Sequence, residues 1–347
     1  MPNPTGAVTL ISAEELRKLG TNIFLKTGIS EQDAHVTVES LVEADLRGVH
    51  SHGTNRIPWY VERLLTGGDN PRPDIRILRE TSNTAVLDGD NGLGQVVSKK
   101  AMELAIGKAA QAGIGMASVR NSHHYGACAY WAQMALPHDM IGLTLTNGGP
   151  VMAPWGGITK TLANDPIGVA VPTGTEIPIV LDMATTIVAG GKLDIAAKKG
   201  EKIPLGWALD VNGMPTQDPV EARAGLILPV GEYKGYGLTV IFEVLAAILS
   251  GANFARQIHF PADPAAPMGI GHFFQAINVE AFMPVNEFKQ RVDQLIQDIK
   301  SSSLAPGFER IYLPGEIEHE RKIKYLAEGI PMASATLESL NSLAKKL

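Results

Sequence analysis

The chain has few of the features that most directly mark a protein's class. Its 347 residues include one cysteine, Cys128, which excludes a disulfide framework and any CxxC metal or redox pair. The 30 basic and 36 acidic residues give a net charge of −6 and form no basic tract, which argues against binding to nucleic acid or to an anionic membrane. The first residues carry no signal-peptide pattern, so we expect a cytoplasmic protein.

Long hydrophobic runs and nucleotide-binding fingerprints are also missing. The most apolar stretch, residues 236–252, contains Glu243 and is too short to span a bilayer. Two glycine-containing segments, 113–118 and 269–274, lack the third glycine of the Rossmann fingerprint. The chain also has no P-loop, no GxSxG and no HExxH motif. Any nucleotide must therefore bind through another kind of loop.

What is present is typical of a globular enzyme with many turns. The 36 glycines and 22 prolines are spread along the chain, and the length predicts two domains. Ser12 and Glu15 predict a capping box for a helix that we expect to end near Gly20, and Ser30 begins a second helix. Helical patterns occupy both ends, with mixed α/β patterns between them that include a buried helix at residues 236–249. We therefore expect the two ends to pack together.

The densest polar cluster is the segment 47–56 (RGVHSHGTNR), which follows the second predicted helix. A histidine such as His52 can give or take a proton near neutral pH. Arg56, four residues later, can bind a carboxylate through two parallel hydrogen bonds, and Ser51 can bond the histidine or a substrate oxygen. The alternative is a loop whose histidine and arginine side chains only neutralise the last carbonyls of the helix. The residues alone favour neither interpretation.

A metal site is a further interpretation of these histidines. The spacing of His50 and His52 can coordinate zinc if both residues lie on a strand. The residues before them have a helical pattern, however, and no convincing third and fourth ligands are evident. A zinc hydrolase that uses His50, His52, His123 and His124 therefore stays a remote alternative, and we predict no metal.

Three other segments have polar or glycine-rich patterns that suit a ligand. Segment 120–126 (RNSHHYG) precedes a predicted helix, whose free N–H groups suit a phosphate or carboxylate, although its polar residues could simply cap that helix. Segment 147–157 (NGGPVMAPWGG) allows close backbone approach to a ligand or merely makes turns. Lys234 opposes the dipole at a helix N-terminus, which favours an anion-binding role. Asp182 ends a strand and either holds ribose hydroxyls or caps the following turn.

Together, eight segments resemble the malate/L-lactate dehydrogenase family of the second type. This family is distinct from the Rossmann-fold malate and lactate dehydrogenases and includes ureidoglycolate, sulfolactate, diketogulonate and Δ1-piperideine-2-carboxylate oxidoreductases. No single segment is decisive, but all eight occur in the family's order over nearly the whole chain. The segments are 45–53 (DLRGVHSHG) with Arg56, 119–126 (VRNSHHYG), 147–157, 181–184 (LDMA), 206–210 (GWALD), 233–237 (YKGYG), 271–274 (GHFF) and 312–316 (YLPGE).

The resemblance implies an α/β fold that is not a Rossmann fold. We expect a mixed-sheet NAD(P)-binding domain at residues 76–279. Residues 1–75 and 280–347 are then expected to form a helical domain that carries part of the substrate site. The resemblance also implies a homodimer, or a dimer of dimers, in which the partner chain completes the site.

The implied reaction is hydride transfer between NAD(P) and C2 of a small 2-hydroxy or 2-oxo acid such as malate or lactate. His52, with Ser51 beside it, matches the family's proton donor or acceptor, and His124 matches a second histidine near the nicotinamide. Arg56 matches the clamp for the substrate carboxylate, with Tyr60 on the same face. The residues expected to hold the cofactor are Gly148, Asp182, Met183, Ala184, Lys234, Gly235, Pro314, Gly315 and Glu316.

One departure from the family concerns the choice of cofactor. Relatives often read Leu-Gly-Thr-Asn-Pro or Leu-Gly-Asn-Asn-Pro where residues 162–166 here read LANDP. A carboxylate at Asp165 near the cofactor would disfavour a 2′-phosphate, so we expect NAD, with NADP possible. Two other functions stay open: reduction of a cyclic or N-alkyl 2-imino acid by the same site, and non-catalytic binding of a small molecule.

Overall fold

The structure, a computed structural model, describes residues 7–258 and 263–347. Residues 1–6, on which the signal-peptide expectation partly rests, lie outside the described residues. The strands are β1 (Val8–Ile11), β2 (Arg76–Glu80), β3 (Thr84–Asp88), β4 (Ile114–Ser122), β5 (Met140–Thr146), β6 (Ile167–Val171), β7 (Ile179–Met183), β8 (Ala208–Leu209), β9 (Leu226–Ile227), β10 (Ile270–Asn278) and β11 (Ile330–Ala333). The α-helices are α1 (Ala13–Leu25), α2 (Glu31–Leu46), α3 (Ile57–Thr66), α4 (Gly94–Ala112), α5 (Cys128–Gln133), α6 (Gly190–Lys199), α7 (Pro219–Ala224), α8 (Tyr233–Glu243), α9 (Val285–Lys300), α10 (Glu316–Glu328) and α11 (Ser334–Lys346).

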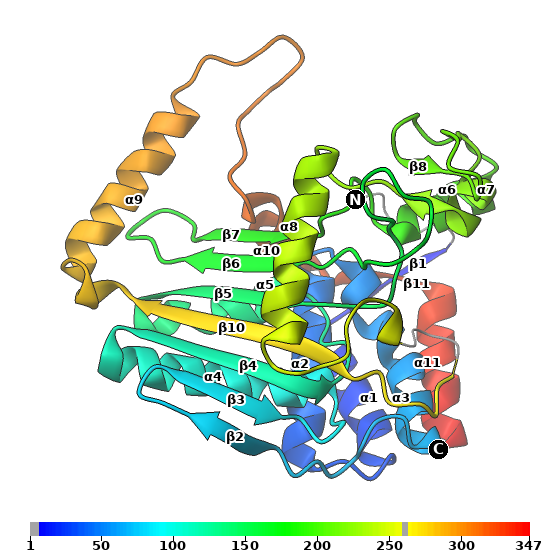
Figure 1. Ribbon diagram of the computed structural model, residues 1–347, viewed down its shortest axis with the longest axis horizontal. Helices are drawn as coiled ribbons and strands as arrows, with labels where there is room; N and C mark the ends of the chain where they lie inside the picture. The colour runs from blue at the N-terminus through cyan, green and yellow to red at the C-terminus, as the bar shows by residue number, and fades with distance from the viewer. Residues whose placement is uncertain (1–6, 259–262) are drawn as a thin grey trace.

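A seven-stranded mixed sheet forms the centre of the molecule (Figure 1). Its strand order is β2-β3-β4-β10-β5-β6-β7. Strands β3 and β4 are parallel, and every other neighbouring pair is antiparallel. This order is not that of a parallel doubly wound sheet. The prediction of a mixed α/β fold without a Rossmann unit is therefore confirmed.

The two faces of the sheet are covered by different helices. Adjacent residues of β10 point to opposite faces, so Phe274 packs with helices α4 and α5 in one core while Phe273 packs against α8 in another. The first core is rich in alanine, and its largest member is the fully buried Trp131. Small side chains let α4 lie close to the sheet. At Gly115 on β4, an added Cβ would lie 2.0 Å from the carbonyl oxygen of Ala105.

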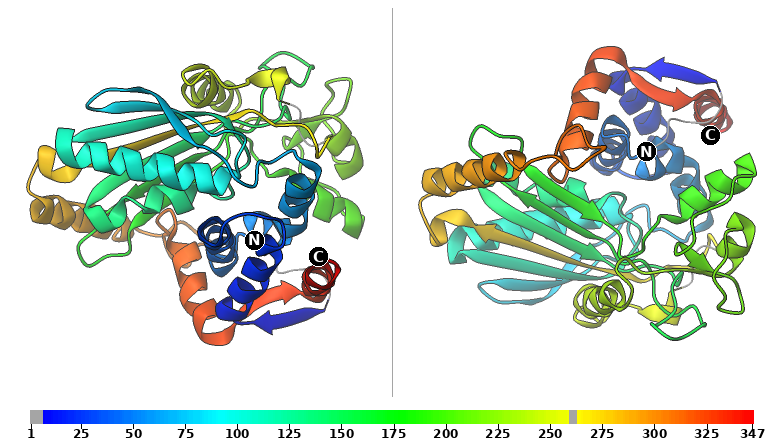
Figure 2. Two further views of the ribbon diagram at one scale, coloured as in Figure 1. Left: turned by 90° about the horizontal axis from the view of Figure 1, so that it is seen from below. Right: turned by 90° about the horizontal axis from the view of Figure 1, so that it is seen from above.

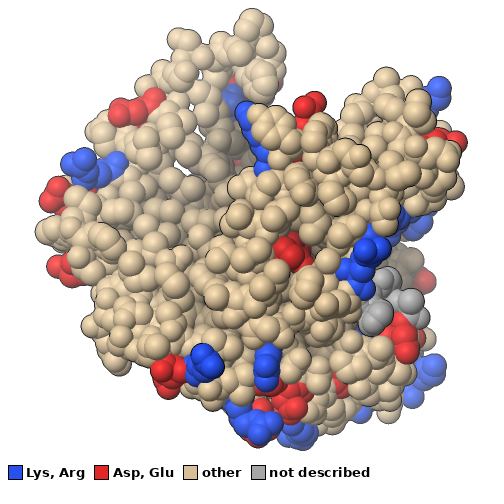
Figure 3. Space-filling view, viewed as in Figure 1, with Lys and Arg blue, Asp and Glu red and all other residues tan. Residues whose placement is uncertain are grey.

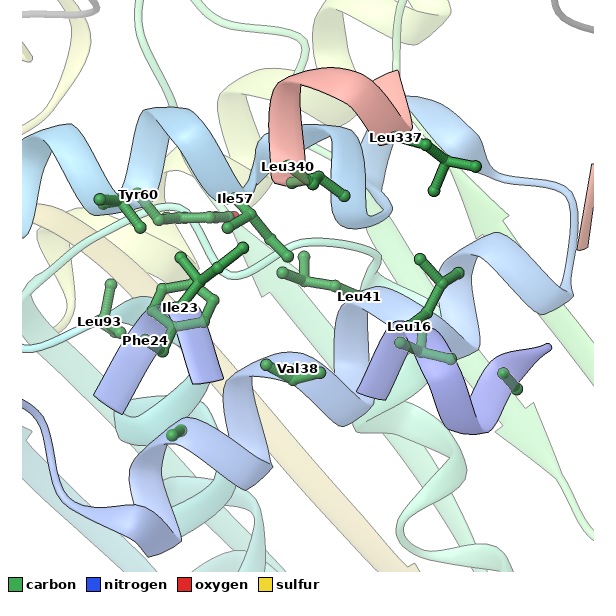
Figure 4. Packing of buried hydrophobic residues seen from close by; sticks show 14 of the residues in the cluster. Leu16, Ile23, Phe24, Val38, Leu41, Ile57, Tyr60, Leu93, Leu337 and Leu340 are labelled. Carbon is green, nitrogen blue, oxygen red and sulfur yellow. The ribbon is translucent and has the colours of Figure 1, made fainter. Parts of the chain in front are cut away.

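A separate helical layer contains elements from both ends of the chain (Figure 2). Strands β1 and β11 pair antiparallel, and helices α1, α2, α3 and α11 share one hydrophobic core (Figure 4). Leu16, Leu41 and Leu340 are each no more than 1% exposed in this core. The expectation that the ends of the chain pack together therefore agrees with the structure, whereas the domain limits at residues 75 and 280 stay a prediction.

Local signals explain how the first two helices begin but not where the first one ends. The Ser12–Glu15 capping box is present, and Ser30 caps α2, which typically contributes about 1 kcal/mol per cap. The expected end of the first helix near Gly20 is wrong, because α1 continues to Leu25. Gly20 lies inside the helix, where an added Cβ would be 3.0 Å from a methyl group of Val38. The glycine therefore allows α1 and α2 to pack closely.

The helix expected to be buried at residues 236–249 is only half covered. Helix α8 continues into a π-helical turn, Val244–Ile248, and packs on the sheet through Phe242 and Ala246. Its other face exposes a stripe of large apolar side chains, and the prediction of a buried helix is wrong for that face of the single chain. The stripe consists of Leu238, Ile241, Val244, Ile248 and Leu249, which are 41–56% exposed.

Helix α9 and the segment after it extend from one end of the sheet (Figure 1). Asp293 attaches α9 to the turn before β7 by accepting hydrogen bonds from the backbone N–H groups of Gly174 and Thr175 at 3.0 and 2.8 Å. Residues 301–315 then return to the body of the molecule and lead into α10. Within residues 7–258 and 263–347, no helix is long and apolar enough to cross a membrane.

Candidate active site

The buried carboxylate of Asp45 organises the loop that follows α2. One oxygen of Asp45 lies 2.8 Å from His50 Nδ1, and the other accepts hydrogen bonds from the N–H and Oγ1 of Thr54 at 2.8 and 2.7 Å. Gly53 is required here because an added Cβ would lie 2.0 Å from the Asp45 carboxylate. These contacts fold residues 50–56 into two short 3-10 turns that present Ser51, His52 and Arg56.

His52 and His124 come together between the helical layer and the sheet. Their rings stack with centroids 5.5 Å apart and planes at 19°. Ser51 Oγ lies 3.0 Å from His52 Nδ1, so Ser51 fixes the orientation of this ring. When Ser51 accepts a hydrogen bond from Nδ1, the Nε2 atom of His52 is the proton acceptor of the neutral ring.

Tyr60 selects the tautomer of His124. The hydroxyl of this fully buried side chain lies 2.6 Å from His124 Nδ1. Burial raises the pKa of Tyr60, so the hydroxyl keeps its proton and donates it to Nδ1. The neutral His124 ring therefore carries its proton on Nε2. Tyr60 thus holds a histidine in place, a role that its predicted position on the substrate face had not suggested.

Arg56 lies beside the two histidines with one edge of its guanidinium group open. Its Nε donates to the carbonyl of Ser51 at 2.8 Å, which anchors the side chain beside the histidines. Its Nη1 and Nη2 groups make no hydrogen bond with the residues that the structure describes. A guanidinium held at one edge and open at the other is suited to a carboxylate.

Both histidines are neutral at pH 7. Burial, followed by the charge of Arg56, lowers the pKa of His52 to about 4. Burial and then the neighbouring His52 and Arg56 lower the pKa of His124 well below its ordinary value. A neutral imidazole beside an unpaired arginine is ready to accept a proton from a bound acid, and binding of that acid's carboxylate would offset the charge of Arg56.

Three of the predicted cofactor segments lie around strand β7 and its end. The residue after Asp182–Ala184, Thr185, accepts a hydrogen bond from Thr239 Oγ1 at 2.7 Å, and its carbonyl oxygen lies against Gly235. On the other side, the carbonyl of Pro314 accepts a hydrogen bond from the N–H of Val180 at 2.9 Å. The structure therefore brings together the segments 182–184, 234–235 and 314–315.

Gly148 reaches the same region through residues 163–165. The carbonyl of Asn164 accepts a hydrogen bond from the N–H of Thr185 at 3.0 Å. An added Cβ at Gly148 would lie 3.5 Å from the side chain of Ala163. Asp182 connects this region to the first residues of α5, because its carboxylate accepts a hydrogen bond from the N–H of Ala129 at 2.9 Å. The chain therefore passes directly from His124 to the helix that contacts Asp182.

The predicted cofactor residues differ in how free they are to bind a ligand. Lys234 is exposed in the first turn of α8, where its ammonium group and the helix N–H groups suit a pyrophosphate. Glu316 is 4% exposed and accepts hydrogen bonds from Lys300, Arg310 and the N–H of Leu313. Its contacts within the chain shape the turn before α10, and its cofactor role stays a prediction.

Asp165 does not support the expectation about the 2′-phosphate. Its side chain is 0% exposed, and burial, followed by the charge of Glu243, raises its pKa well above the ordinary value. A buried, protonated carboxyl group carries no charge and so does not repel the 2′-phosphate of NADP. The argument from Asp165 for NAD over NADP is therefore lost.

The other two histidines of the zinc interpretation, His50 and His123, have partners of their own. His50 bonds to Asp45, and the buried His123 lies 3.1 Å from Arg63 and 3.0 Å from Asp69. Residues 7–258 and 263–347 contain no group of three or more histidine, cysteine, aspartate or glutamate residues placed to hold a metal ion. The zinc interpretation therefore has no ligand set in this part of the chain.

Sequence reasoning missed the side chains that hold the site from behind. Arg63, 1% exposed, bonds Asp69 at 2.9 Å and the carbonyl of Ala266 at 2.9 Å, and so links α3 to the segment before β10. His272 on β10 lies 2.8 Å from both Ser122 and Thr146. The Asp-to-His spacing of five residues at the end of α2 is the one local signal that could have identified Asp45.

Known proteins resemble this chain over almost its full length. A family model described as malate/L-lactate dehydrogenase matches residues 11–341. The L-sulfolactate dehydrogenase of Methanocaldococcus jannaschii is 47% identical over 91% of each chain. The malate dehydrogenase of Pyrococcus abyssi is 42% identical over 97% of this chain and 94% of its own. The NAD(+)-dependent ureidoglycolate dehydrogenase of Escherichia coli K12 is 34% identical over 96% and 95%.

Solved structures agree in fold as well as in sequence. The sulfolactate dehydrogenase of M. jannaschii superposes with a TM-score of 0.92 at 44% identity and covers 97% of both chains. A delta1-piperideine-2-carboxylate reductase from Pseudomonas syringae superposes with a TM-score of 0.87 at 30% identity, covering 96% of this chain and 99% of its own. The mixed sheet and its helical layers are thus those of solved oxidoreductases.

Proposed function

The chain belongs to the malate/L-lactate dehydrogenase family and is a dehydrogenase of 2-hydroxy acids, and from that premise we propose that it transfers a hydride between NAD and C2 of malate, sulfolactate or a closely related acid. The observation that carries this proposal is the pair of stacked, neutral histidines beside the open guanidinium of Arg56. Relatives named for malate and sulfolactate support an acid with a second anionic group. Lactate, which has a single carboxylate, is the weaker candidate.

His52 accepts the proton of the C2 hydroxyl in oxidation and returns it in reduction. Its neutral state in the free chain suits the first of these roles, and Ser51 keeps the ring oriented while its charge changes. Arg56 binds the C1 carboxylate through its open Nη edge and thereby fixes C2. His124, stacked beside His52 and with a proton on Nε2, donates a hydrogen bond to the substrate.

The residues around β7 fit a dinucleotide. The nicotinamide, when bound, accepts or supplies the hydride. Lys234 and the α8 N-terminus would hold the pyrophosphate, and Gly315, which has a φ of +85° and no side chain, would allow the cofactor to approach the backbone closely. The carboxylate of Asp182 would accept hydrogen bonds from ribose hydroxyls. NAD is preferred in this proposal because a relative is named for NAD(+), and NADP is the alternative.

An absorbance assay at 340 nm tests the proposal. NADH and NADPH are each mixed with oxaloacetate, sulfopyruvate, pyruvate or glyoxylate, with and without methylamine, and with a cyclic 2-imino acid. We expect oxidation of NADH by oxaloacetate or sulfopyruvate without amine. No oxidation with any pair would refute the assignment.

Reduction of a 2-imino acid is the second candidate. The fold likeness to a piperideine-2-carboxylate reductase favours it, because the same carboxylate clamp and proton donor serve a C=N bond. Oxidation of the cofactor only when an amine or a cyclic imine is present would select this activity.

We further propose that a second copy of the chain covers the apolar stripe of α8. The face of the molecule over α8 carries few charged side chains (Figure 3). A stripe of five large apolar residues, 41–56% exposed on one helix, is typical of an association surface. Ile241→Glu is expected to reduce the mass measured by light scattering to that of a monomer. Leu65 on α3 is an equally exposed leucine, and Leu65→Glu should leave the mass unchanged.

The cytoplasmic location stays a prediction.

A further inference from the structure

Two buried carboxyl groups face each other behind the glycine-rich loop at residues 147–149. Asp165 is 0% exposed and Glu243, the last residue of α8, is 4% exposed. Both oxygens of Asp165 and Oε2 of Glu243 are buried without a hydrogen-bond partner at normal geometry among the residues described. Two ionised carboxylates cannot share such a site at tolerable cost, so one of them keeps its proton.

The surroundings place the proton on Asp165. Glu243 Oε1 accepts hydrogen bonds from the N–H of Ala255 at 2.6 Å and from the side-chain amide of Asn147 at 3.3 Å. Two donors at one oxygen suit a carboxylate that carries the negative charge. Burial and the charge of Glu243 raise the pKa of Asp165, and only the backbone N–H groups of Gly148 and of Asp165 itself act in the other direction. Within the described part of the chain, Glu243 is the titratable group that acts on Asp165.

The pair connects segments that belong to the proposed cofactor region. Asn147 bonds Glu243, the carbonyl of Asn253 at 2.9 Å and the N–H of Gly271 at 2.9 Å, and it immediately precedes Gly148. Glu243 lies at the end of α8, whose first turn carries Lys234. Movement of the pair would therefore displace the glycine loop and the end of α8.

We propose that Asp165 and Glu243 form an acid pair that holds one proton, positions the 147–149 loop for the cofactor, and loosens that loop when a rise in pH removes the proton. This inference rests on the proposed function for its link to the cofactor. The proton leaves Asp165 for solvent, and the two adjacent negative charges then repel each other. Asparagine keeps the shape of a protonated aspartate and cannot ionise.

The first arm of the test measures unfolding without cofactor. The folded chain keeps a proton that the unfolded chain has released, so raising the pH favours the unfolded state until Asp165 ionises. The urea unfolding constant of the wild type should rise about tenfold per pH unit relative to that of Asp165→Asn between pH 6 and the pH at which Asp165 ionises. Asp293→Asn is the control, because Asp293 is a carboxylate whose bonded N–H groups lower its pKa, and its loss should change stability equally at every pH in this range.

The second arm measures the dissociation constant of NADH by fluorescence from pH 6 to 9.5. We expect at least tenfold weaker binding by the wild type at the alkaline end and less than a twofold change for Asp165→Asn. Equal pH dependence in the two proteins overturns the proposal. If Asp165→Asn does not fold, Glu243→Gln removes the repulsion that follows ionisation of Asp165, and its NADH dissociation constant should also change less than twofold over this pH range.

The two arms separate this inference from the proposed function. If neither protein binds NADH or NADPH at any pH, the proposed function fails. The unfolding arm then decides the acid pair alone: loss of the pH slope in Asp165→Asn supports it, and an unchanged slope overturns it.

Discussion

Replacement of Asp45 by alanine tests whether the loop that carries His52 is held from behind. The carboxylate accepts hydrogen bonds from the N–H and Oγ1 of Thr54 at 2.8 and 2.7 Å and lies 2.8 Å from His50 Nδ1. Thr54 is 0% exposed, so Asp45→Ala leaves two buried donors without a partner. Each such donor costs about 1–3 kcal/mol, so the free energy of unfolding should fall by roughly 2–6 kcal/mol.

The assay is urea unfolding followed by circular dichroism, together with kcat at a temperature where the variant is folded. Asp45→Asn keeps an acceptor for Thr54 and should lose only about 1–2 kcal/mol. In a Thr54→Val background one of the two orphaned donors is already absent, so Asp45→Ala should cost about 1–3 kcal/mol less there. A loss below about 0.5 kcal/mol for Asp45→Ala, or strictly additive effects with Thr54→Val, would refute the reasoning.

Three further predictions concern the residues around the histidines. Arg56→Lys should raise KM for the acid about 10–100-fold with little change in kcat, because a point charge replaces a two-pronged donor, and an unchanged KM would remove the clamp role. Tyr60→Phe frees the tautomer of His124 and should lower kcat about tenfold and stability by about 1 kcal/mol, whereas Tyr125→Phe, another buried tyrosine, should affect stability alone. Because His52 must be neutral to accept a proton, kcat/KM for oxidation should be level above about pH 5 and fall below it with an apparent pKa of about 4. A profile that becomes level only above pH 7 would contradict the effect of burial and of Arg56.

Features set by local chemistry could be predicted from the sequence. The capping box at Ser12 depends on residues three positions apart, and it is present. The motif that contains Ser51, His52 and Arg56 folds as one loop because Gly48 adopts a positive φ of 73° and Gly53 leaves room for the Asp45 carboxylate. The family resemblance then supplied His124 and Tyr60, which the structure places against this loop.

Features set by distant partners could not be predicted in this way. The bond between Tyr60 and His124 joins residues 64 positions apart, and its consequence for the histidine tautomer follows only from the fold. The end of the first helix was wrong because Gly20 serves packing against Val38 and does not stop the helix. Whether the apolar face of α8 is covered depends on a second molecule, which one chain's hydrophobic pattern does not specify. The raised pKa of Asp165 depends on burial and on Glu243, which lies 78 residues later in the sequence.

The rate of NADH oxidation with oxaloacetate, measured for the wild type and for His52→Gln, tests the central claim most directly. The account predicts an active wild-type protein and a variant whose turnover is lower by about 10²–10⁴-fold, with the NADH dissociation constant unchanged. His35→Gln, which alters an exposed histidine on α2, should behave as the wild type. Equal turnover by His52→Gln and the wild type would contradict the assignment of His52 as the group that moves the proton.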